Sequence, residues 1–486
     1  MTTGSWRRPR RFDYNLVVIG AGSAGLTAAY VAAAAKAKVA LIEKDRMGGD
    51  CLNTGCVPSK ALIRSARFAA ELRRGQDLGF CNSHAEVDFA AVMARVRRVI
   101  GRVQPHDSVE RYTRLGVDCI AGEARIRSPW CVKVGGRSLS TRAIVIATGA
   151  RPTIPPVPGI SQTGYLTSDT VWGLKVLPRR LLVLGGGPVG CELAQCFARF
   201  GSQVTIVEMA PRILLREDPE VSAAVADRLR AEGADLRTDH RALEFGQDAD
   251  GQSLSCAYRG GTLRLGFDQL LVAVGRKANI EGFGLEELGI PAAPAGTIET
   301  NAWLQTLHPS VYACGDVAGP YPYTHTAAHQ AWHAAVNALL GVKGIRVDYA
   351  MIPRATFTDP EVAGVGMNEQ QARQQGIAYE LTRYGLDDLD RAIADEAAHG
   401  FIKLLTVPGK DRILGATIVG EHAADLIAEY ALAMRHRLGL KDILGTIHIY
   451  PTLAEANKLA AGVWRHAHTP ERLLRWLARY HAWRRG

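Results

Sequence analysis

Two short apolar runs, residues 14–19 and 180–184, open similar stretches of the chain. Each is followed by a glycine-rich turn, a helix-length segment and a second apolar run, at 38–42 and at 203–207. A short continuous apolar run bounded by turn residues is typical of a strand buried on both faces of a parallel sheet. The pattern therefore predicts an α/β protein with two copies of a strand–turn–helix–strand unit.

Both turns have the glycine spacing of a dinucleotide-binding site. Such glycines permit a tight turn, the approach of the backbone to a pyrophosphate, and close packing of helix on strand. The helix N-terminus offers N–H groups to the phosphates, and an acid after the second strand can accept hydrogen bonds from a ribose. The predicted cofactor-binding residues, equally spaced in the two copies, are Gly20, Gly22, Gly25 and Glu43, and Gly185, Gly187, Gly190 and Glu208.

One such motif is weak evidence, but two copies in the same structural context are specific. Two bound dinucleotides suggest that one donates electrons and the other passes them on. The carboxylate of Glu208 favours the free 2′-hydroxyl of NADH and would repel a 2′-phosphate, although Arg212 and Arg216 follow closely and would soften that preference. We therefore expect NADH as the donor, with NADPH as the alternative.

The length of 486 residues is too great for a single core and suggests about three domains. The chain contains no run of the roughly 18 uninterrupted apolar residues that a membrane-spanning helix requires. Arginine pairs at 7–8 and 10–11 are similar to the start of an export signal, but the short apolar segment after them runs directly into the first glycine-rich turn. We expect a mature cytoplasmic protein.

The net charge of +10 is interpreted as a solvated basic surface, or as attraction to anionic substrates and membranes. With no zinc-finger spacing and no aromatic–basic signature, neither nucleic-acid binding nor a resident metal is expected. The nine cysteines form no regular framework, and their odd number argues against a secreted disulfide scaffold. Most of them are expected to be small buried hydrophobic residues.

Cys51 and Cys56 lie together in a segment rich in glycine and polar residues. On a regular helix their Cα atoms would be about 8.6 Å apart, whereas a disulfide requires less than about 7 Å. A bond between them therefore needs a distorted segment, and Asn53 and Gly55 are residues that tolerate one. Beside two dinucleotide sites, a redox role for this pair is favoured over a structural one.

Four segments together resemble the pyridine nucleotide–disulfide oxidoreductases, the family of lipoamide dehydrogenase, glutathione reductase and mercuric reductase. Residues 48–60 resemble the redox-active segment, 143–149 the end of the FAD domain at Gly149, 271–276 its counterpart after the nicotinamide domain, and 311–319 the second FAD motif. The resemblance covers nearly the whole chain. It implies two Rossmann-like dinucleotide-binding domains and a C-terminal α+β dimerisation domain, FAD as cofactor, a homodimer with shared active sites, and a role in cell redox homeostasis.

The resemblance also implies roles for single residues. Cys56 would be the sulfur next to the flavin and Cys51 the interchange thiol that attacks the acceptor. Lys60 and Glu192 would form an ion pair beside the flavin and nicotinamide rings, and Asp316 would bond the ribityl chain of FAD. Asp50 is a departure, because many relatives have Thr there, and an added carboxylate should raise the pKa of Cys51.

The expected interface domain departs from lipoamide dehydrogenase and glutathione reductase. Those enzymes have a His before Pro-Thr, paired with a Glu five residues later; here Tyr450 takes the place of the His, while Glu455 is present. A phenol with a pKa near 10 is a poor base at neutral pH. In an extended segment, His448 would lie on the same face as Tyr450, about 7 Å away; a structural role for His448 is favoured over a catalytic one.

A Tyr followed by Glu and by the residues at 458–461 is similar to mercuric reductase, where a phenol helps to bind the metal. The vicinal cysteine pair at the C-terminus of mercuric reductases is missing, since the last cysteine is Cys314. The tail is expected to form a helix with Thr469 as N-cap and Pro470 at its first position. Residues 470–485 would form a basic, Trp-rich helix that packs on its own dimer or contacts an anionic membrane surface.

The expected domains are a first FAD-binding part at 12–155, an NAD(P)-binding domain at 156–284, a return of the FAD domain at 285–350, an interface domain at 351–466, and the tail at 467–486. We predict an enzyme that relays electrons from NAD(P)H through FAD and the Cys51–Cys56 disulfide to a small disulfide or soft-metal acceptor. The alternatives are dihydrolipoamide dehydrogenase, direct reduction of a quinone or O₂ by the flavin, and a non-enzymatic redox sensor.

Overall fold

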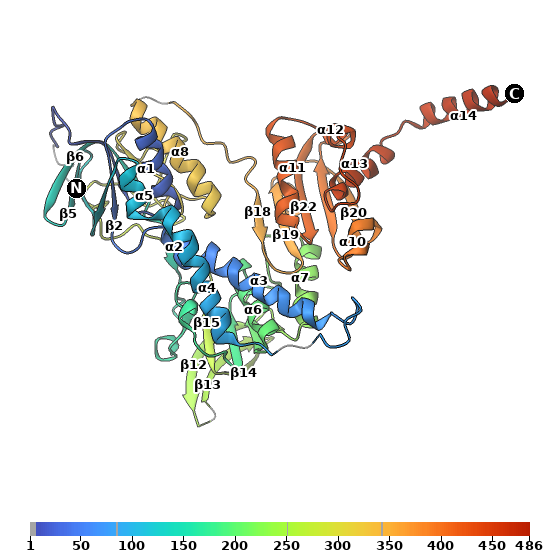
Figure 1. Cartoon of the computed structure of the whole chain (residues 1–486), viewed down its shortest axis with the longest axis horizontal. Coiled ribbons are helices and arrows are strands. Elements are labelled where there is room, and N and C mark those ends of the chain that lie inside the picture. The colour runs from blue at the N-terminus through green and yellow to red at the C-terminus, as the bar shows by residue number, and fades with distance from the viewer. Residues whose placement is uncertain (1–5, 84–85, 250, 342–343) are drawn as a thin grey trace. The chain divides into compact units, whose positions relative to one another are not determined.

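The computed structural model describes residues 6–83, 86–249, 251–341 and 344–486 and divides the chain into two compact units (Figure 1). Unit 1 contains the described residues up to 207 and those from 240 to 348. Unit 2 contains residues 208–239 and 349–486. Each unit has a hydrophobic core of its own.

The main sheet of unit 1 is the first predicted dinucleotide-binding unit, with additional strands. Its order is β3-β2-β1-β6-β5-β4, and β17 also pairs with β6. The strands β1 and β2 are parallel, with Leu16 opposite Val39, which confirms the predicted pair of buried strands. The strands are β1 (Tyr14–Ile19), β2 (Val39–Glu43), β3 (Val117–Ala121), β4 (Arg125–Ser128), β5 (Cys131–Val134), β6 (Arg137–Ile146) and β17 (Val311–Ala313).

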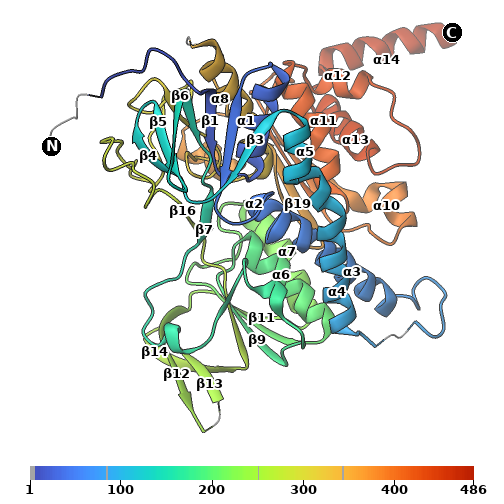
Figure 2. The same cartoon turned by 60° about the vertical axis from the view of Figure 1, so that its left-hand side comes forward.

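Two helices that are far apart in sequence pack against each other beside this sheet: α1 (Ser23–Ala34) and α8 (Thr324–Leu340) (Figure 2). Their buried faces consist largely of alanine, including Ala28 and Ala32 on α1 and Ala331 and Ala335 on α8. Small side chains allow the two backbones to approach closely, so α8 is held near the glycine-rich turn that begins α1.

The second predicted unit forms another sheet, in which β10, β9, β15 and β8 lie side by side in that order. Helix α6 begins after the second glycine-rich turn and ends, as predicted, at Phe200, where Gly201 has a φ of +111°. Its elements are β8 (Leu166–Thr167), β9 (Arg180–Leu184), α6 (Pro188–Phe200), β10 (Gln203–Val207) and β15 (Gln269–Val272).

The remaining elements of unit 1 connect or cover these two sheets. The redox segment lies on α2 and α3, and α3 packs against both α4 and α6. The elements are α2 (Gly49–Asn53), α3 (Cys56–Arg73), α4 (Phe89–Val103), η1 (Gln104–Asp107), α5 (Val109–Arg114), β7 (Ala150–Pro152), η2 (Ile160–Gln162), η3 (Val171–Gly173), β12 (Arg241–Asp248), β13 (Gly251–Tyr258), β14 (Gly261–Phe267) and β16 (Arg276–Ala278).

Unit 2 is built on an antiparallel sheet with the order β18-β19-β22-β21-β20. Helices α11 and α13 contribute apolar side chains such as Tyr430 and Trp464 to its core. The elements are α7 (Pro219–Ala231), β11 (Asp235–Arg237), β18 (Arg354–Thr356), β19 (Glu361–Gly366), α9 (Glu369–Gln374), β20 (Glu380–Gly385), η4 (Leu386–Asp388), α10 (Asp390–Ala394), β21 (Phe401–Thr406), β22 (Ile413–Gly420), α11 (Ala423–Arg435), α12 (Leu440–Gly445), α13 (Glu455–Ala467) and α14 (Glu471–Arg485).

The tail forms the expected helix, α14, which has no buried residue and extends away from the rest of unit 2 (Figure 1). The predicted start was wrong by one residue, because Pro470 occupies the N-cap position and Glu471 begins the helix. The Thr469 hydroxyl instead donates to the Arg465 carbonyl at 3.0 Å, which ties Thr469 to the end of α13. Among the described residues, no helix is long and apolar enough to cross a membrane.

Candidate active site

The helix that carries the cysteine pair breaks between the two cysteines, as predicted. Helix α2 ends at Asn53 and α3 begins at Cys56. The carbonyl of Asp50 accepts hydrogen bonds from the N–H groups of Thr54 at 2.9 Å and Gly55 at 2.5 Å, which closes the turn. Cys56 is thus the first residue of α3, where the helix N-terminus stabilises a thiolate.

The two thiols are free and have different proton affinities. A hydrogen bond from the Cys51 thiol lowers the pKa of Cys56 to about 6 and outweighs the effect of burial. The same hydrogen bond and burial raise the pKa of Cys51. Thr324, the first residue of α8, lies 3.3 Å from the Cys56 sulfur and also lowers its pKa. At neutral pH this order of proton affinities favours a Cys56 thiolate beside a Cys51 thiol.

Lys60 and Glu192 form the ion pair that the family resemblance implied. The Lys60 ammonium donates to a Glu192 carboxylate oxygen at 2.8 Å, and Glu192 lies buried on α6. Lys60 is four residues after Cys56 on α3, so both side chains lie on the same face of that helix. The Lys60 charge accordingly helps to lower the pKa of Cys56.

The first glycine-rich turn fits a dinucleotide. Gly20 has a φ of +99°, and a Cβ there would lie 2.4 Å from the Ala147 carbonyl oxygen. A Cβ on Gly25 would lie 1.7 Å from the Gly20 carbonyl oxygen, so both positions require glycine. A Cβ on Gly22 would approach nothing closer than 3.8 Å, and α1 begins without a side-chain cap. The N–H groups of α1 are therefore open to a phosphate, as FAD binding requires.

The second turn repeats this geometry. A Cβ on Gly185 would lie 2.5 Å from the Ala273 carbonyl oxygen, and one on Gly190 would lie 2.1 Å from the Gly185 carbonyl oxygen. No atom lies within 4 Å of a Cβ built on Gly187, and α6 also begins without a side-chain cap. The turn thus leaves room for a pyrophosphate at Gly187, while Gly185 and Gly190 pack closely against backbone.

The two predicted ribose acids accept hydrogen bonds from nearby backbone N–H groups. Glu43 accepts from Ala21 in the first turn at 2.6 Å, so its carboxylate lies directly at the predicted FAD site. Glu208, which follows β10 in the chain, accepts from Ala210 at 2.8 Å.

Asp316 lies in a turn that α8 holds at both ends. The side chain of Gln330 accepts from the Gly315 N–H at 2.6 Å and donates to the Gly319 carbonyl at 2.7 Å. Burial raises the pKa of Asp316, and the nearby Arg276 opposes the shift. Gly149, the other predicted FAD residue, has a φ of +66° in the turn after β6.

Tyr450 and His448 point to different surroundings, so the condition for a common face, an extended segment, is not met. Residues 447–450 do not form a strand. Tyr450 is 67% exposed and donates to Asp390 at 3.0 Å, a hydrogen bond that raises the pKa of the phenol. The His448 side chain is 7% exposed, and its two ring nitrogens lie 2.9 Å from Glu429 and 3.0 Å from the Thr446 carbonyl. These contacts favour a structural role for His448.

Glu455 begins α13 and accepts a long hydrogen bond of 3.4 Å from the Thr452 N–H. By its resemblance to lipoamide dehydrogenase, Glu455 corresponds to the acid that pairs with a His in that enzyme. Here Asp390 is the acid that contacts Tyr450, and it comes from α10 rather than from α13.

Comparison with known sequences identifies the family. The profile of the pyridine nucleotide-disulphide oxidoreductases matches residues 14–336, and that of their dimerisation domain matches residues 352–461. The chain belongs to this family. Pyridine nucleotide-disulphide oxidoreductases of this kind are NAD(P)H-dependent flavoprotein enzymes that use FAD, and the dimerisation domain supports a homodimer.

Individual relatives include enzymes with different acceptors. The chain is 34% identical over 449 residues to mercuric reductase of Staphylococcus aureus, covering 92% of this chain and 82% of that one. It is 35% identical over 448 residues to dihydrolipoyl dehydrogenase of Chlamydia muridarum, covering 91% and 95%. The chain is thus about equally similar in sequence to a mercuric reductase and to a dihydrolipoyl dehydrogenase, and sequence identity does not distinguish between the two activities.

Solved structures agree with this assignment. The HOCl-induced flavoprotein disulfide reductase RclA from Escherichia coli, in the Cu(II) complex of a Cys-to-Ser mutant, gives a TM-score of 0.83 at 27% identity, covering 93% of this chain and 100% of that one. LpdA from Mycobacterium tuberculosis gives a TM-score of 0.84 at 27% identity, covering 92% and 99%.

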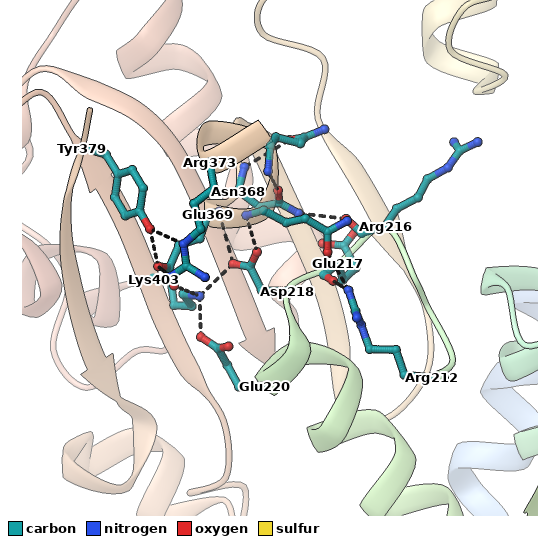
Figure 3. Close-up of polar contacts among 12 residues, drawn as sticks. Arg212, Arg216, Glu217, Asp218, Glu220, Asn368, Glu369, Arg373, Tyr379 and Lys403 are labelled. Carbon is teal, nitrogen blue, oxygen red and sulfur yellow. Dashed lines mark hydrogen bonds and ion pairs between the residues drawn. The ribbon is translucent and has the colours of Figure 1, made fainter. Parts of the chain in front are cut away.

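A second polar cluster of this oxidoreductase lies wholly within unit 2 (Figure 3). Asp218, Glu220 and Glu369 are close enough together to hold a metal ion. The ammonium of Lys403 occupies the position between them, donating to Asp218 at 2.7 Å, to Glu369 at 2.6 Å and to Glu220. We call these four residues the Lys403 cluster. It is an ion-pair cluster, buried except for the exposed Glu220, rather than a cation site.

Several residues of these sites were not predicted from the sequence. Lys403 is a single charge within the apolar strand β21, and that isolation was the available signal. Thr324 and Asp390 carry no signal of their own, and Arg276 was seen only as the end of the motif at 271–276, because the partners of all three residues are distant in the chain.

Proposed function

We propose that this oxidoreductase passes electrons from NAD(P)H through FAD to the Cys51–Cys56 disulfide, and from there to a soft metal ion or a small disulfide. The observation that carries the proposal is the asymmetric thiol pair, with a Cys56 thiolate at the start of α3 beside the Lys60–Glu192 ion pair. NADH is the proposed donor because Glu208 would accept hydrogen bonds from a free ribose hydroxyl.

The residues of the chain then act in a defined order. Bound FAD supplies a hydride acceptor that can return two electrons to the disulfide. Gly20, Gly22 and Glu43 would hold its pyrophosphate and ribose, Asp316 would bond the ribityl chain, and Lys60 stabilises the Cys56 thiolate. Reduction breaks the Cys51–Cys56 bond, adds two electrons and one proton, and leaves a Cys56 thiolate and a protonated Cys51.

Two exchanges return these electrons to a disulfide acceptor. Cys51 loses its proton and attacks one acceptor sulfur, so that a mixed disulfide forms and the first thiolate leaves. Cys56 then attacks the Cys51 sulfur, the mixed disulfide breaks, the Cys51–Cys56 bond re-forms, and the second thiolate leaves, so the acceptor has gained two electrons in total. With Hg(II), Cys51 also loses its proton and the two thiolates bind the metal as soft ligands. Two electrons then pass to the metal, which leaves as Hg(0), and the Cys51–Cys56 bond re-forms.

A metal acceptor is favoured over lipoamide by Tyr450, which stands where lipoamide dehydrogenase has its His. Mercuric reductase is among the relatives, and a Cu(II) complex is known for RclA. We propose a homodimer in which the exposed Tyr450 of one protomer serves the cysteine pair of its partner. The matched dimerisation profile includes Tyr450, and the adjacent Ile447 and Ile449 are also exposed.

Replacing Tyr450 by Phe tests the acceptor. We expect turnover with Hg(II) to fall by about 10- to 100-fold, the usual loss on removing a group that supports a metal. Reduction of a small aromatic disulfide should change less than twofold. Tyr480→Phe, on α14, is the matched control. Equal losses with both acceptors, or none with Hg(II), would contradict the assignment of Tyr450 to metal binding.

We also propose that α14 contacts an anionic membrane surface. Its apolar side chains Leu473, Trp476 and Trp483 are exposed, and Trp476 stacks on Tyr480. Five arginines on the same helix supply positive charge: Arg472, Arg475, Arg479, Arg484 and Arg485. A basic helix with exposed tryptophans is suited to an anionic lipid surface.

Sedimentation with lipid vesicles tests this contact. The full-length protein should bind vesicles that contain phosphatidylserine at least tenfold more tightly than neutral ones, and salt should weaken the binding. Trp476→Ser with Trp483→Ser should abolish it without changing the oligomeric state. Equal binding to neutral vesicles, or a change from dimer to monomer in this variant, would assign the helix to another role.

A further inference from the structure

The guanidinium of Arg276 joins three carboxylates that come from separate segments of unit 1. It donates to Asp50 at the start of α2 and to the Ala150 carbonyl at 2.7 Å. Its other nitrogens lie 3.9 Å from Asp169 and 4.0 Å from Asp316. One cation therefore connects the residue before Cys51 with the acid expected at the ribityl chain of FAD.

This group is partly removed from solvent. The Arg276 side chain is 27% exposed, and burial raises the pKa of both Asp50 and Asp316 while Arg276 opposes the shift. The pKa of Cys51 is raised, as predicted, but Asp50 is not among the main causes. Cys56 and burial raise the pKa of Cys51, and the Asp50 carboxylate faces Arg276.

The backbone of Asp50 also closes the turn between the cysteines. Its carbonyl accepts from both Thr54 and Gly55, the two residues that separate α2 from α3. Helix α2 has only 5 residues and no side-chain cap, so it cannot be stable without tertiary contacts. A movement of Asp50 would consequently move the turn that sets the distance between the Cys51 and Cys56 sulfurs.

We propose that the Asp50–Arg276 ion pair is a positioning device for the cysteine pair, which holds the two sulfurs at the separation that favours the disulfide. Asp50 and Arg276 are positioning residues, since they act through the backbone of the turn. The inference rests on the proposed redox role of Cys51 and Cys56. Loss of the ion pair lowers the effective concentration of one thiol at the other, so the disulfide becomes easier to reduce.

The experiment is a redox titration of the purified full-length holoenzyme against dithiothreitol. In this exchange the Cys51–Cys56 bond breaks, the cyclic disulfide of the reagent forms, and two electrons pass to the protein; above the pKa of Cys56 one proton goes to solvent. Alkylation and peptide mapping measure the fraction of each thiol. A wild-type protein without a reversible Cys51–Cys56 disulfide would refute the proposed function itself.

Four variants then test the positioning role: Asp50→Asn, Arg276→Gln, their double variant, and Asp50→Thr. If the pair positions the turn, each single variant should raise the equilibrium constant for reduction by about fivefold, or roughly 20 mV at about 30 mV per tenfold. The double variant should shift no further than either single one. Asp50→Thr, with the residue of many relatives, gives a second reading if Asp50→Asn is poorly folded.

A purely electrostatic effect would give a different pattern. Removing the Asp50 charge would then favour the Cys56 thiolate, removing the Arg276 charge would disfavour it, and the double variant would return to the wild-type value. Opposite shifts of this kind, or no shift in any variant, would overturn the proposal. Asp45→Asn is the matched control, because this exposed carboxylate lies in the same segment and contacts Arg46.

Discussion

Replacing Cys51 by Ser should lower turnover with thiol-dependent acceptors by on the order of 10³-fold or more, as expected when a nucleophile is removed. In the proposed relay Cys51 is the thiol that attacks the acceptor, and its hydrogen bond lowers the pKa of Cys56. The variant should still accept a hydride from NADH, because the glycine-rich turns and the Lys60–Glu192 pair are unchanged. Steady-state rates and rapid-mixing spectra of flavin reduction measure the two steps separately.

The pH dependence of alkylation adds a second measurement in the wild-type dithiol. Because the pKa of Cys56 is lowered to about 6, iodoacetamide should label Cys56 with a rate that rises through pH 6 and then levels off. The pKa of Cys51 is raised, so labelling of Cys51 should remain slow up to pH 9. Mass spectrometry assigns the label to each peptide.

Cys81→Ser is the matched control, since Cys81 is also free and exposed. It should leave both the rates and the alkylation profile unchanged. If Cys51→Ser keeps full turnover with a quinone or with O₂, the flavin passes electrons directly and the thiol relay is not the main route. Full turnover of the same variant with Hg(II) or a disulfide would contradict the role of Cys51.

Local sequence patterns were sufficient for the parts of the site that depend on neighbouring residues. The two glycine-rich turns require glycine because a Cβ at Gly25 or Gly190 would collide with backbone within the same turn. The helix break at residues 54–55 follows from the spacing of the cysteines. Such constraints act over a few residues, so they can be read from the chain alone.

The parts that were not predicted depend on contacts between distant segments. Asp50 was expected to act on its neighbour Cys51, but the fold brings Arg276 to its carboxylate and neutralises it. His448 and Tyr450 would share a face only in an extended segment, whereas the segment is not a strand and His448 contacts Glu429 of α11. The position of a cation along the chain does not determine which of several distant acids it contacts in the folded protein.

The Lys403 cluster shows the same limit most clearly, and it gives the largest expected effect on stability. Lys403 is fully buried, and its carboxylate partners come from α7 and α9 and from the residue before α7. Removing one partner of a buried ion pair leaves uncompensated charge, which typically costs about 3–5 kcal/mol. We expect Lys403→Met to lower the free energy of unfolding by about this amount at pH 7, as measured by urea denaturation.

At low pH, the free energies of unfolding of Lys403→Met and of the wild type should become more similar. Hydrogen bonds from Lys403 and Tyr379 outweigh burial and lower the pKa of Glu369. A carboxyl group with a lowered pKa stabilises the folded state above its unfolded pKa of about 4.3, and this contribution is lost as the pH falls through the folded value. Without Lys403, burial instead favours protonated Glu369, so Lys403→Met should regain stability relative to the wild type as the pH falls.

Two further variants test whether the loss of stability comes from the Lys403 cluster or from the removal of any lysine. Lys410→Met removes an exposed lysine just after the same strand and should change the free energy of unfolding by less than about 0.5 kcal/mol. Adding Glu369→Gln to Lys403→Met removes one of the uncompensated charges and should recover part of the loss, because the two residues are in direct contact. A loss equal to that of Lys410→Met, or strictly additive effects of the two cluster variants, would mean that the ion pairs do not stabilise unit 2.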